Sequence, residues 1–163
     1  MKNKIQQLAI KIGNLVKKRI IQVVTLAILK FQVKVEGHDM GWMLTYIIGP
    51  IFNSVSGLKT KPLDQRYWTC SKEDFDKIID ADWVNEKKYI KERFDCDDFA
   101  IQLKARFSAI FGLNNVALVI NKSHVFNLIF FSDSTYKFFE PQNDAWVTKT
   151  TGKYSLTNAL IIF

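Results

Sequence analysis

The sequence predicts an α+β protein in which helices come first and an antiparallel sheet follows. Apolar residues recur at helical spacing in the first two-thirds of the chain, and short β-branched and aromatic runs fill the last third. Turn residues separate those runs, which is typical of strands joined by hairpins. With 163 residues, of which 48% are hydrophobic, the chain is long enough for one domain with its own core and an appendage.

The N-terminal segment, residues 1–34, is predicted to be a basic amphipathic helix or anchor, and residues 35–163 form the second unit. From Ile5 to Phe31 apolar residues recur at helical spacing, and Gly13 would divide the helix in two. The net charge of +7 is concentrated in this segment, which has no acidic residue. Its basic residues are Lys2, Lys4, Lys11, Lys17, Lys18, Arg19, Lys30 and Lys34.

Three interpretations of this segment stay open. It is a helix packed on its own domain or a partner, a helix on a membrane surface or an uncleaved anchor, or a secretion signal. Its densest apolar run, Ile20 to Leu29, is shorter than the roughly 20 residues that cross a bilayer. We expect an anionic membrane surface as a partner, and we expect no nucleic acid because aliphatic rather than aromatic residues alternate with the lysines. The cellular location is undetermined beyond this membrane association.

The middle of the chain predicts shorter helices. An apolar block begins at Met40, and Pro50 would stop or kink its helix. Residues 59–65 are expected to be a loop. Ser71 begins a sequence typical of a capping box, which predicts a helix to about Asp80 with Phe75 on its buried face.

The next predicted helix carries a cysteine at its first position. Asp95 is expected as the N-cap, with Cys96 first and Asp98 third in the helix, and Gly112 ends it. The residues that follow predict strands at 116–120, 124–131, 135–140, 145–149 and 154–163.

Three residues suggest nucleophilic chemistry: Cys96, His124 and Glu140. A thiol at a helix N-terminus lies near the positive end of the helix dipole, which favours the reactive thiolate. His124 would act as its general base, and Glu140 would orient the imidazole. The order Cys, His, acid along the chain matches papain-like and transglutaminase-like enzymes.

The geometry of the hairpin between His124 and Glu140 tests this hypothesis. Side chains alternate between the faces of a strand, so the two residues share a face only if the loop between their strands has an odd length. A three-residue loop at 132–134 pairs Phe131 with Thr135 and places Gln142 opposite His124. A pairing one step tighter would place Glu140 opposite His124 instead.

Acidic residues surround the cysteine in a way that suggests calcium. Asp95, Asp97 and Asp98 would disfavour a thiolate, and a hard cation bound by their carboxylates would remove the conflict. Residues 142–144 offer further oxygen ligands. A disulfide between Cys70 and Cys96 is an open alternative, whereas zinc lacks the usual ligand spacing.

The string from Phe94 to Ala100, together with His124 and the Glu-Pro-Gln at 140–142, resembles a papain-like cysteine peptidase family. It is similar to the calcium-dependent protease domain at the C-terminus of certain fungal lectins, with relatives in bacteria and phages. The resemblance implies a papain-like arrangement in which the cysteine helix packs on the sheet. It implies the catalytic triad Cys96, His124 and Glu140, with Asp97, Asp98 and Gln142 as calcium ligands or site-shaping residues.

These observations predict a thiol hydrolase, most simply a cysteine peptidase with a peptide or protein substrate. The alternative is a papain-like scaffold without activity that serves as a membrane-associated protein or a phage or bacterial assembly protein.

Overall fold

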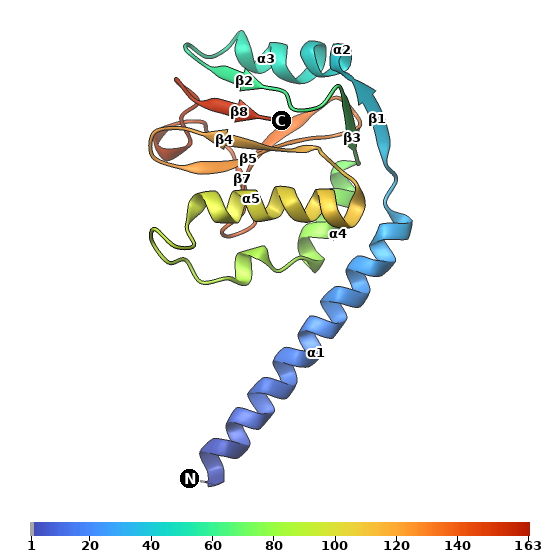
Figure 1. Cartoon of the computed structure of the whole chain (residues 1–163), viewed down its shortest axis with the longest axis vertical. Coiled ribbons are helices and arrows are strands. Elements are labelled where there is room, and N and C mark those ends of the chain that lie inside the picture. The colour runs from blue at the N-terminus through green and yellow to red at the C-terminus, as the bar shows by residue number, and fades with distance from the viewer. Residues whose placement is uncertain (1) are drawn as a thin grey trace.

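A six-stranded sheet forms the centre of the fold in the computed structural model, which describes residues 2–163 apart from the side chains of Lys2, Asn3 and Ile5 (Figure 1). The strand order is β2-β8-β4-β5-β6-β7. Neighbouring strands are antiparallel, except that β2 and β8 run parallel. The strands are β2 (Lys59–Lys61), β4 (Val116–Ile120), β5 (Val125–Phe130), β6 (Tyr136–Glu140), β7 (Ala145–Val147) and β8 (Leu160–Ile162).

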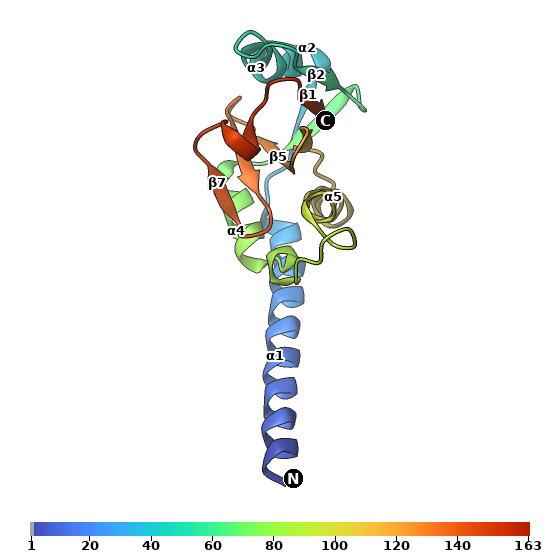
Figure 2. The ribbon, with the colours of Figure 1, turned by 90° about the vertical axis from the view of Figure 1, so that its left-hand side faces the viewer.

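Helices cover both faces of this sheet (Figures 1 and 2). One face carries α4 (Lys72–Ala81) and α5 (Cys96–Arg106), which continues as the π-helical turn η3 (Phe107–Phe111). The other face carries α2 (Met40–Trp42), the π-helical η1 (Met43–Ile48) and α3 (Gly49–Phe52). A separate antiparallel pair, β1 (Glu36–Asp39) and β3 (Arg66–Thr69), completes the body with the short turns η2 (Val84–Glu86) and η4 (Gly152–Tyr154).

The predicted class is confirmed in its broad form: helices lie mainly in the N-terminal part and the sheet in the C-terminal part. The parallel pairing of β2 with β8 is an exception to the antiparallel expectation, and β2 lies where a loop was predicted. The papain-like arrangement stays a prediction, as does the division into residues 1–34 and 35–163.

Two apolar cores result from the alternation of side chains along β5. Phe126, Leu128 and Phe130 face the core under η1 and α3, whereas Ile129 faces the core under α4 and α5. All four side chains are fully buried. Because β5 is covered on both faces, it consists of apolar residues without the polar alternation of a half-exposed strand, apart from Asn127.

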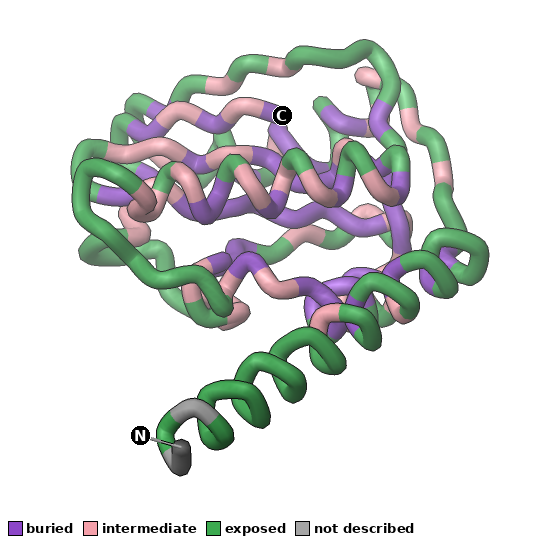
Figure 3. The backbone as a smooth tube through the Cα atoms, turned by 60° about the horizontal axis from the view of Figure 1, so that its bottom comes forward, coloured by how far each residue is buried: buried purple, intermediate pink, exposed green. Residues whose placement is uncertain are grey.

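The helix α1 (Lys2–Gln32) is continuous, so the predicted division at Gly13 is wrong. Only its C-terminal end packs on the body, where Leu26 and Leu29 are buried against the core that contains α4 (Figure 3). The rest projects away from the body. Within residues 2–163, no helix combines the length and apolar character needed to cross a membrane.

Several predicted element ends are confirmed and others are not. The Asp74 N–H donates to Ser71 Oγ at 3.1 Å, as the predicted cap requires, and Gly112 ends the cysteine helix with φ of 68°. Pro50 lies in the first turn of α3 and does not end the helical segment. The strand predicted at 154–163 is only β8, because residues 152–154 form a helical turn.

Phe75 on α4 is the central aromatic residue of one core, and its replacement tests how that core is stabilised. Its ring contacts Phe107, Phe131, Phe139 and Trp146 at centroid distances of 5.0, 5.9, 5.5 and 5.4 Å. We expect Phe75→Ala to lower the free energy of unfolding by about 3–5 kcal/mol, because it leaves a cavity. Urea denaturation measures this. Leu8→Ala, on the exposed part of α1, should change stability by less than about 0.5 kcal/mol, and an equal loss in both variants would contradict the prediction.

Candidate functional site

The hairpin of β5 and β6 brings His124 and Glu140 together. Its loop is the three-residue 132–134, since the Phe131 N–H donates to the Thr135 carbonyl at 2.9 Å and Phe130 pairs with Tyr136. The predicted odd loop length is confirmed. In this register both side chains lie on one face, and His124 Nε2 is 2.6 Å from Glu140 Oε2.

Glu140 is a buried carboxylate whose oxygens are well supplied with donors. Its Oε2 accepts from the Tyr154 hydroxyl at 2.9 Å and the Lys153 ammonium at 3.3 Å, besides His124. Its Oε1 accepts from the Gln142 N–H at 3.3 Å. Burial alone would raise the pKa of Glu140, but the hydrogen bonds and the charge of His124 outweigh it and leave the pKa below its usual value.

The His124 ring is held in one orientation. An ionised carboxylate can only accept, so His124 Nε2 carries the proton and Nδ1 is the second ring nitrogen, available to another group. The ring stacks on Phe126 at 6.0 Å and meets the edge of Tyr154 at 5.5 Å. Such packing leaves the imidazole little freedom to rotate.

Cys96 lies at the same end of the sheet as His124. Asn127 Nδ2 donates to the Ala100 carbonyl at 3.2 Å, and Lys104 Nζ donates to the Val116 carbonyl at 2.8 Å. Since Val116 pairs with Ile129, α5 runs in the same direction as β5, and its N-terminus lies beside the start of that strand. One helical turn before Ala100, about 6 Å, leads to Cys96.

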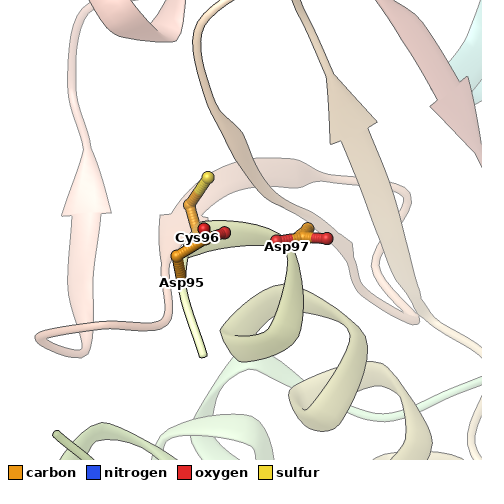
Figure 4. Close-up of side chains that lie close together, drawn as sticks. All are labelled: Asp95, Cys96 and Asp97. Atoms are coloured by element: carbon orange, nitrogen blue, oxygen red, sulfur yellow. The ribbon is translucent and has the colours of Figure 1, made fainter. Parts of the chain in front are cut away.

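Cys96 is not joined to the His–Glu pair by a hydrogen bond. In the described part of the chain, the Cys96 sulfur makes no hydrogen bond, to His124 or to any other group. Figure 4 shows Cys96 and Asp97 leaving the first turn of α5 in different directions, with Asp95 just before them. The predicted triad is therefore a hydrogen-bonded His–Glu pair with a thiol nearby.

The acidic residues at this helix start have distinct roles. Asp98 accepts from the Asp95 N–H at 3.1 Å, as the predicted cap requires. The Asp95 and Asp97 carboxylates lie close together, and their interaction raises the pKa of Asp97 and lowers that of Asp95. Asp95, Cys96 and Asp97 place candidate ligand atoms within 4.8 Å of one another.

The other cysteine is structural. Cys70 is buried, and burial raises its pKa to about 12, so it stays a protonated thiol. Both cysteines are free, and the alternative of a Cys70–Cys96 disulfide is wrong.

Two hollows lie beside β7. A groove of about 310 Å³ is lined by Glu140, Ala145, Trp146, Val147, Thr148, Lys149, Thr151 and Tyr154. An acidic cavity of about 520 Å³ lies between α1, α4 and the same strand. Asp144 opens onto it, and burial together with the charge of Asp82 raises its pKa to about 7. Asp144 therefore lies among acidic side chains of α4 and η2.

Sequence reasoning missed the groove. Tyr154 and Lys153 complete the surroundings of Glu140 from a segment predicted as a strand, and Trp146 had no predicted role. In the sequence, these three residues are distinguished only by lying within about fifteen positions of Glu140. Such proximity does not predict that their side chains contact Glu140.

An α+β body with helices on both faces of the sheet, and with a buried His–Glu pair beside a groove, defines the class of this domain. Residues 53–163 match the family model described as the ricin-type β-trefoil lectin C-terminal domain. The match covers more than half of the chain, and the chain belongs to this family.

Two solved structures share the fold. One is described as a PSL1a–E64 complex, with a TM-score of 0.58, 20% identity, and coverage of 78% of this chain and 51% of that one. The other is a Polyporus squamosus lectin bound to Neu5Acα2-6Galβ1-4GlcNAc, with a TM-score of 0.53, 22% identity, and coverage of 78% and 49%. The chain thus spans about half the length of each. No curated protein matches it.

These findings correct the interpretation of the sequence. The family and one of the matched structures are described as lectins, so the assignment to a papain-like or transglutaminase-like peptidase family is wrong. The prediction of an enzyme, a thiol hydrolase acting on peptides, is wrong on the same grounds, and the alternative of an inactive papain-like assembly scaffold gains no support. The physical reason is that the order of a cysteine, a histidine and an acidic residue along the chain predicts only how these side chains are arranged. The same arrangement can serve different functions.

The lowered pKa of Glu140 predicts how stability depends on pH. The unfolded carboxyl titrates near 4.3. Its contribution to stability is therefore present above that pH and is lost as the pH falls through the lower folded pKa. We expect Glu140→Gln to be less stable at pH 7 by about 2–3 kcal/mol and to lose less stability on acidification. Urea denaturation between neutral and acidic pH measures both. Glu92→Gln, on the exposed loop, is the control, and parallel pH curves for wild type and Glu140→Gln would contradict the prediction.

Proposed function

We propose that the chain is a carbohydrate-binding module of a lectin-type protein and that a glycan binds in the groove beside Glu140. The lectin family supports the class of ligand, and a matched structure of the same fold is described as bound to a sialylated trisaccharide. The observation that carries the proposal is the chemistry of the groove itself.

The groove combines the contacts that a sugar uses. Trp146 and Tyr154 offer aromatic surface for the apolar faces of sugar rings, and the hydroxyls of Thr148 and Thr151 can both donate and accept hydrogen bonds. Exposed Lys149 adds a positive charge at the rim. A volume of about 310 Å³ lies at the lower end of the range for small-molecule sites, which suits one or two sugar rings.

The predicted site residues have positioning roles in this proposal. Glu140 lines the groove and holds the Tyr154 hydroxyl and the Lys153 ammonium in place, and His124 completes its hydrogen bonds. Cys96 lies at the same end of the sheet without lining the groove. The buried pair thereby keeps one wall of the groove rigid before a ligand arrives, which lowers the entropic cost of binding.

Lys149→Ala tests the groove with a defined ligand. We expect calorimetric titration of the wild-type chain to detect Neu5Acα2-6Galβ1-4GlcNAc, and to give weaker binding of Galβ1-4GlcNAc, which lacks the carboxylate that Lys149 would meet. Lys149→Ala should lower the affinity for the sialylated ligand about fivefold to tenfold and leave the affinity for the neutral ligand nearly unchanged.

Lys122→Ala, an exposed lysine away from the groove, is the matched control. Failure of the wild type to bind either saccharide at millimolar concentration would contradict carbohydrate binding. Equal losses in Lys149→Ala and Lys122→Ala would contradict the groove as its site.

Calcium is a second component of the proposal. The Asp95 and Asp97 carboxylates lie close together, and a divalent cation between them would relieve their repulsion. Asp98 has one carboxylate oxygen committed to the helix cap, which leaves the other for a metal. Gln142, predicted as a further ligand, donates its backbone N–H to Glu140, so its side-chain oxygen is the atom that would bind the metal. Asp97 is the best placed of the predicted ligands, because its ligand atom lies within 4.8 Å of that of Asp95.

Asp97→Asn tests this metal site. We expect calcium titration of the wild type at pH 7 to show binding, because two neighbouring carboxylates supply charged oxygen ligands. Asp97→Asn should lower the affinity for calcium at least about tenfold, since it removes a charged ligand. Asp133→Asn, in the exposed hairpin loop, should bind as the wild type does. Absence of calcium binding, or the same affinity in Asp97→Asn, would refute the site.

The predicted contact between residues 1–34 and an anionic membrane surface is a further proposal, favoured by the projection of α1 from the body. The absence of a nucleic-acid partner stays a prediction.

A further inference from the structure

The exposed part of α1 carries an apolar stripe along nearly its whole length. Its members recur every three or four residues, which places them on one side of the helix. Ile12, Val16 and Ile20 are each half or more exposed, and Phe31 is 90% exposed. We call the set the outer stripe: Ala9, Ile12, Val16, Ile20, Val23, Ala27 and Phe31.

The outer stripe lies on a different side of the helix from the residues that pack on the body, and of its members Val23 and Ala27 border the body. The residues of α1 and its end that are buried against the body are Gln22, Leu26, Leu29 and Val33. At 100° per residue, these lie about 120° around the helix from the outer stripe. The stripe is therefore open to solvent along the part of the helix that projects from the body (Figure 2).

The charges of α1 select the kind of surface. The segment has no acidic residue, and Lys17 and Lys30 lie beside the stripe, as does Arg19, which also pairs with Glu86 on the body at 3.3 Å. Long basic side chains at the edge of an apolar stripe can reach anionic headgroups while their stems stay in apolar surroundings. A second copy of the same helix would bring lysines against lysines without acidic partners, which disfavours self-association.

Beside the outer stripe, an apolar hollow lies where α1 meets the body. A cavity of about 340 Å³ is lined by Val23, Leu26, Ala27, Lys30, Trp83, Ala109 and Ile110. Trp83 lies against two guanidinium groups, with Arg19 and Arg106 at 5.0 and 3.9 Å from its ring. Apolar surface with an indole and cations at its margin has the chemistry of the bilayer interface.

We infer that the outer stripe, together with the hollow at Trp83, is a single surface that lies on an anionic phospholipid bilayer. The inference deepens the proposed membrane contact of residues 1–34 and rests on it. The stripe enters the boundary between headgroups and acyl chains, and the flanking lysines and arginine stay at the headgroup level.

Vesicle co-sedimentation of the full chain tests the inference. We expect binding to phosphatidylcholine vesicles that contain phosphatidylglycerol, at least about tenfold tighter than to phosphatidylcholine alone and weakened by salt. The double variant Val16→Glu/Ile20→Glu, which places two carboxylates on the stripe, should lose at least about tenfold in affinity. The uncharged Val16→Gln/Ile20→Gln should lose less, with helix content and thermal midpoint retained in both variants.

The matched control adds the same two charges elsewhere on the helix. Gln7→Glu/Asn14→Glu lies on exposed positions off the stripe and should retain most of the binding. If the wild type does not bind anionic vesicles, the proposed membrane contact itself fails. If it binds but the stripe and control variants lose equally, the contact stands and the outer stripe is refuted as its face. A dimer in sedimentation velocity that the stripe variants abolish would assign the stripe to a second copy and overturn the inference.

Discussion

The buried charge of Glu140 is the constraint on which the arrangement of the candidate site depends. A carboxylate taken out of water is tolerated only where donors replace its hydration. Here the donors come from three separate places: His124 before β5, Gln142 after β6, and the 153–154 turn. The hairpin, the turn at 152–154 and one wall of the groove are therefore held by a single group, and loosening any of them would leave a buried charge without a partner.

The same constraint explains why the order of a cysteine, a histidine and an acidic residue along the chain predicts the function of the protein poorly. The His–Glu pair fixes an imidazole, and an oriented imidazole serves a structural wall as well as a chemical step. The thiol at the start of α5 lies at the same end of the sheet but beside two closely spaced carboxylates, those of Asp95 and Asp97. The lectin family changes the interpretation of these residues and leaves their geometry unchanged.

The molecule places two different surfaces on opposite parts of the chain. The groove at β7 belongs to the segment that matches the family, whereas α1 precedes that segment. The two surfaces also differ in chemistry, since one combines hydroxyls, aromatic rings and a carboxylate, and the other combines aliphatic residues with cations. An N-terminal helix that contacts a membrane and a body that binds a glycan would both direct the protein to a cell surface.

The sequence by itself determined the local features of this protein. Helical periodicity and capping residues specify α1, α4 and α5, and the odd loop at 132–134 specifies the register that puts His124 and Glu140 on one face. Only the tertiary structure decided the parallel pairing of β2 with β8, the enclosure of Glu140 by Lys153 and Tyr154, and the side of the sheet on which Asp144 lies. Capping and register depend on residues a few positions apart, so the chain carries them directly. Pairing across a hundred residues and the burial of a charge depend on which distant segments pack together, and no local pattern encodes that.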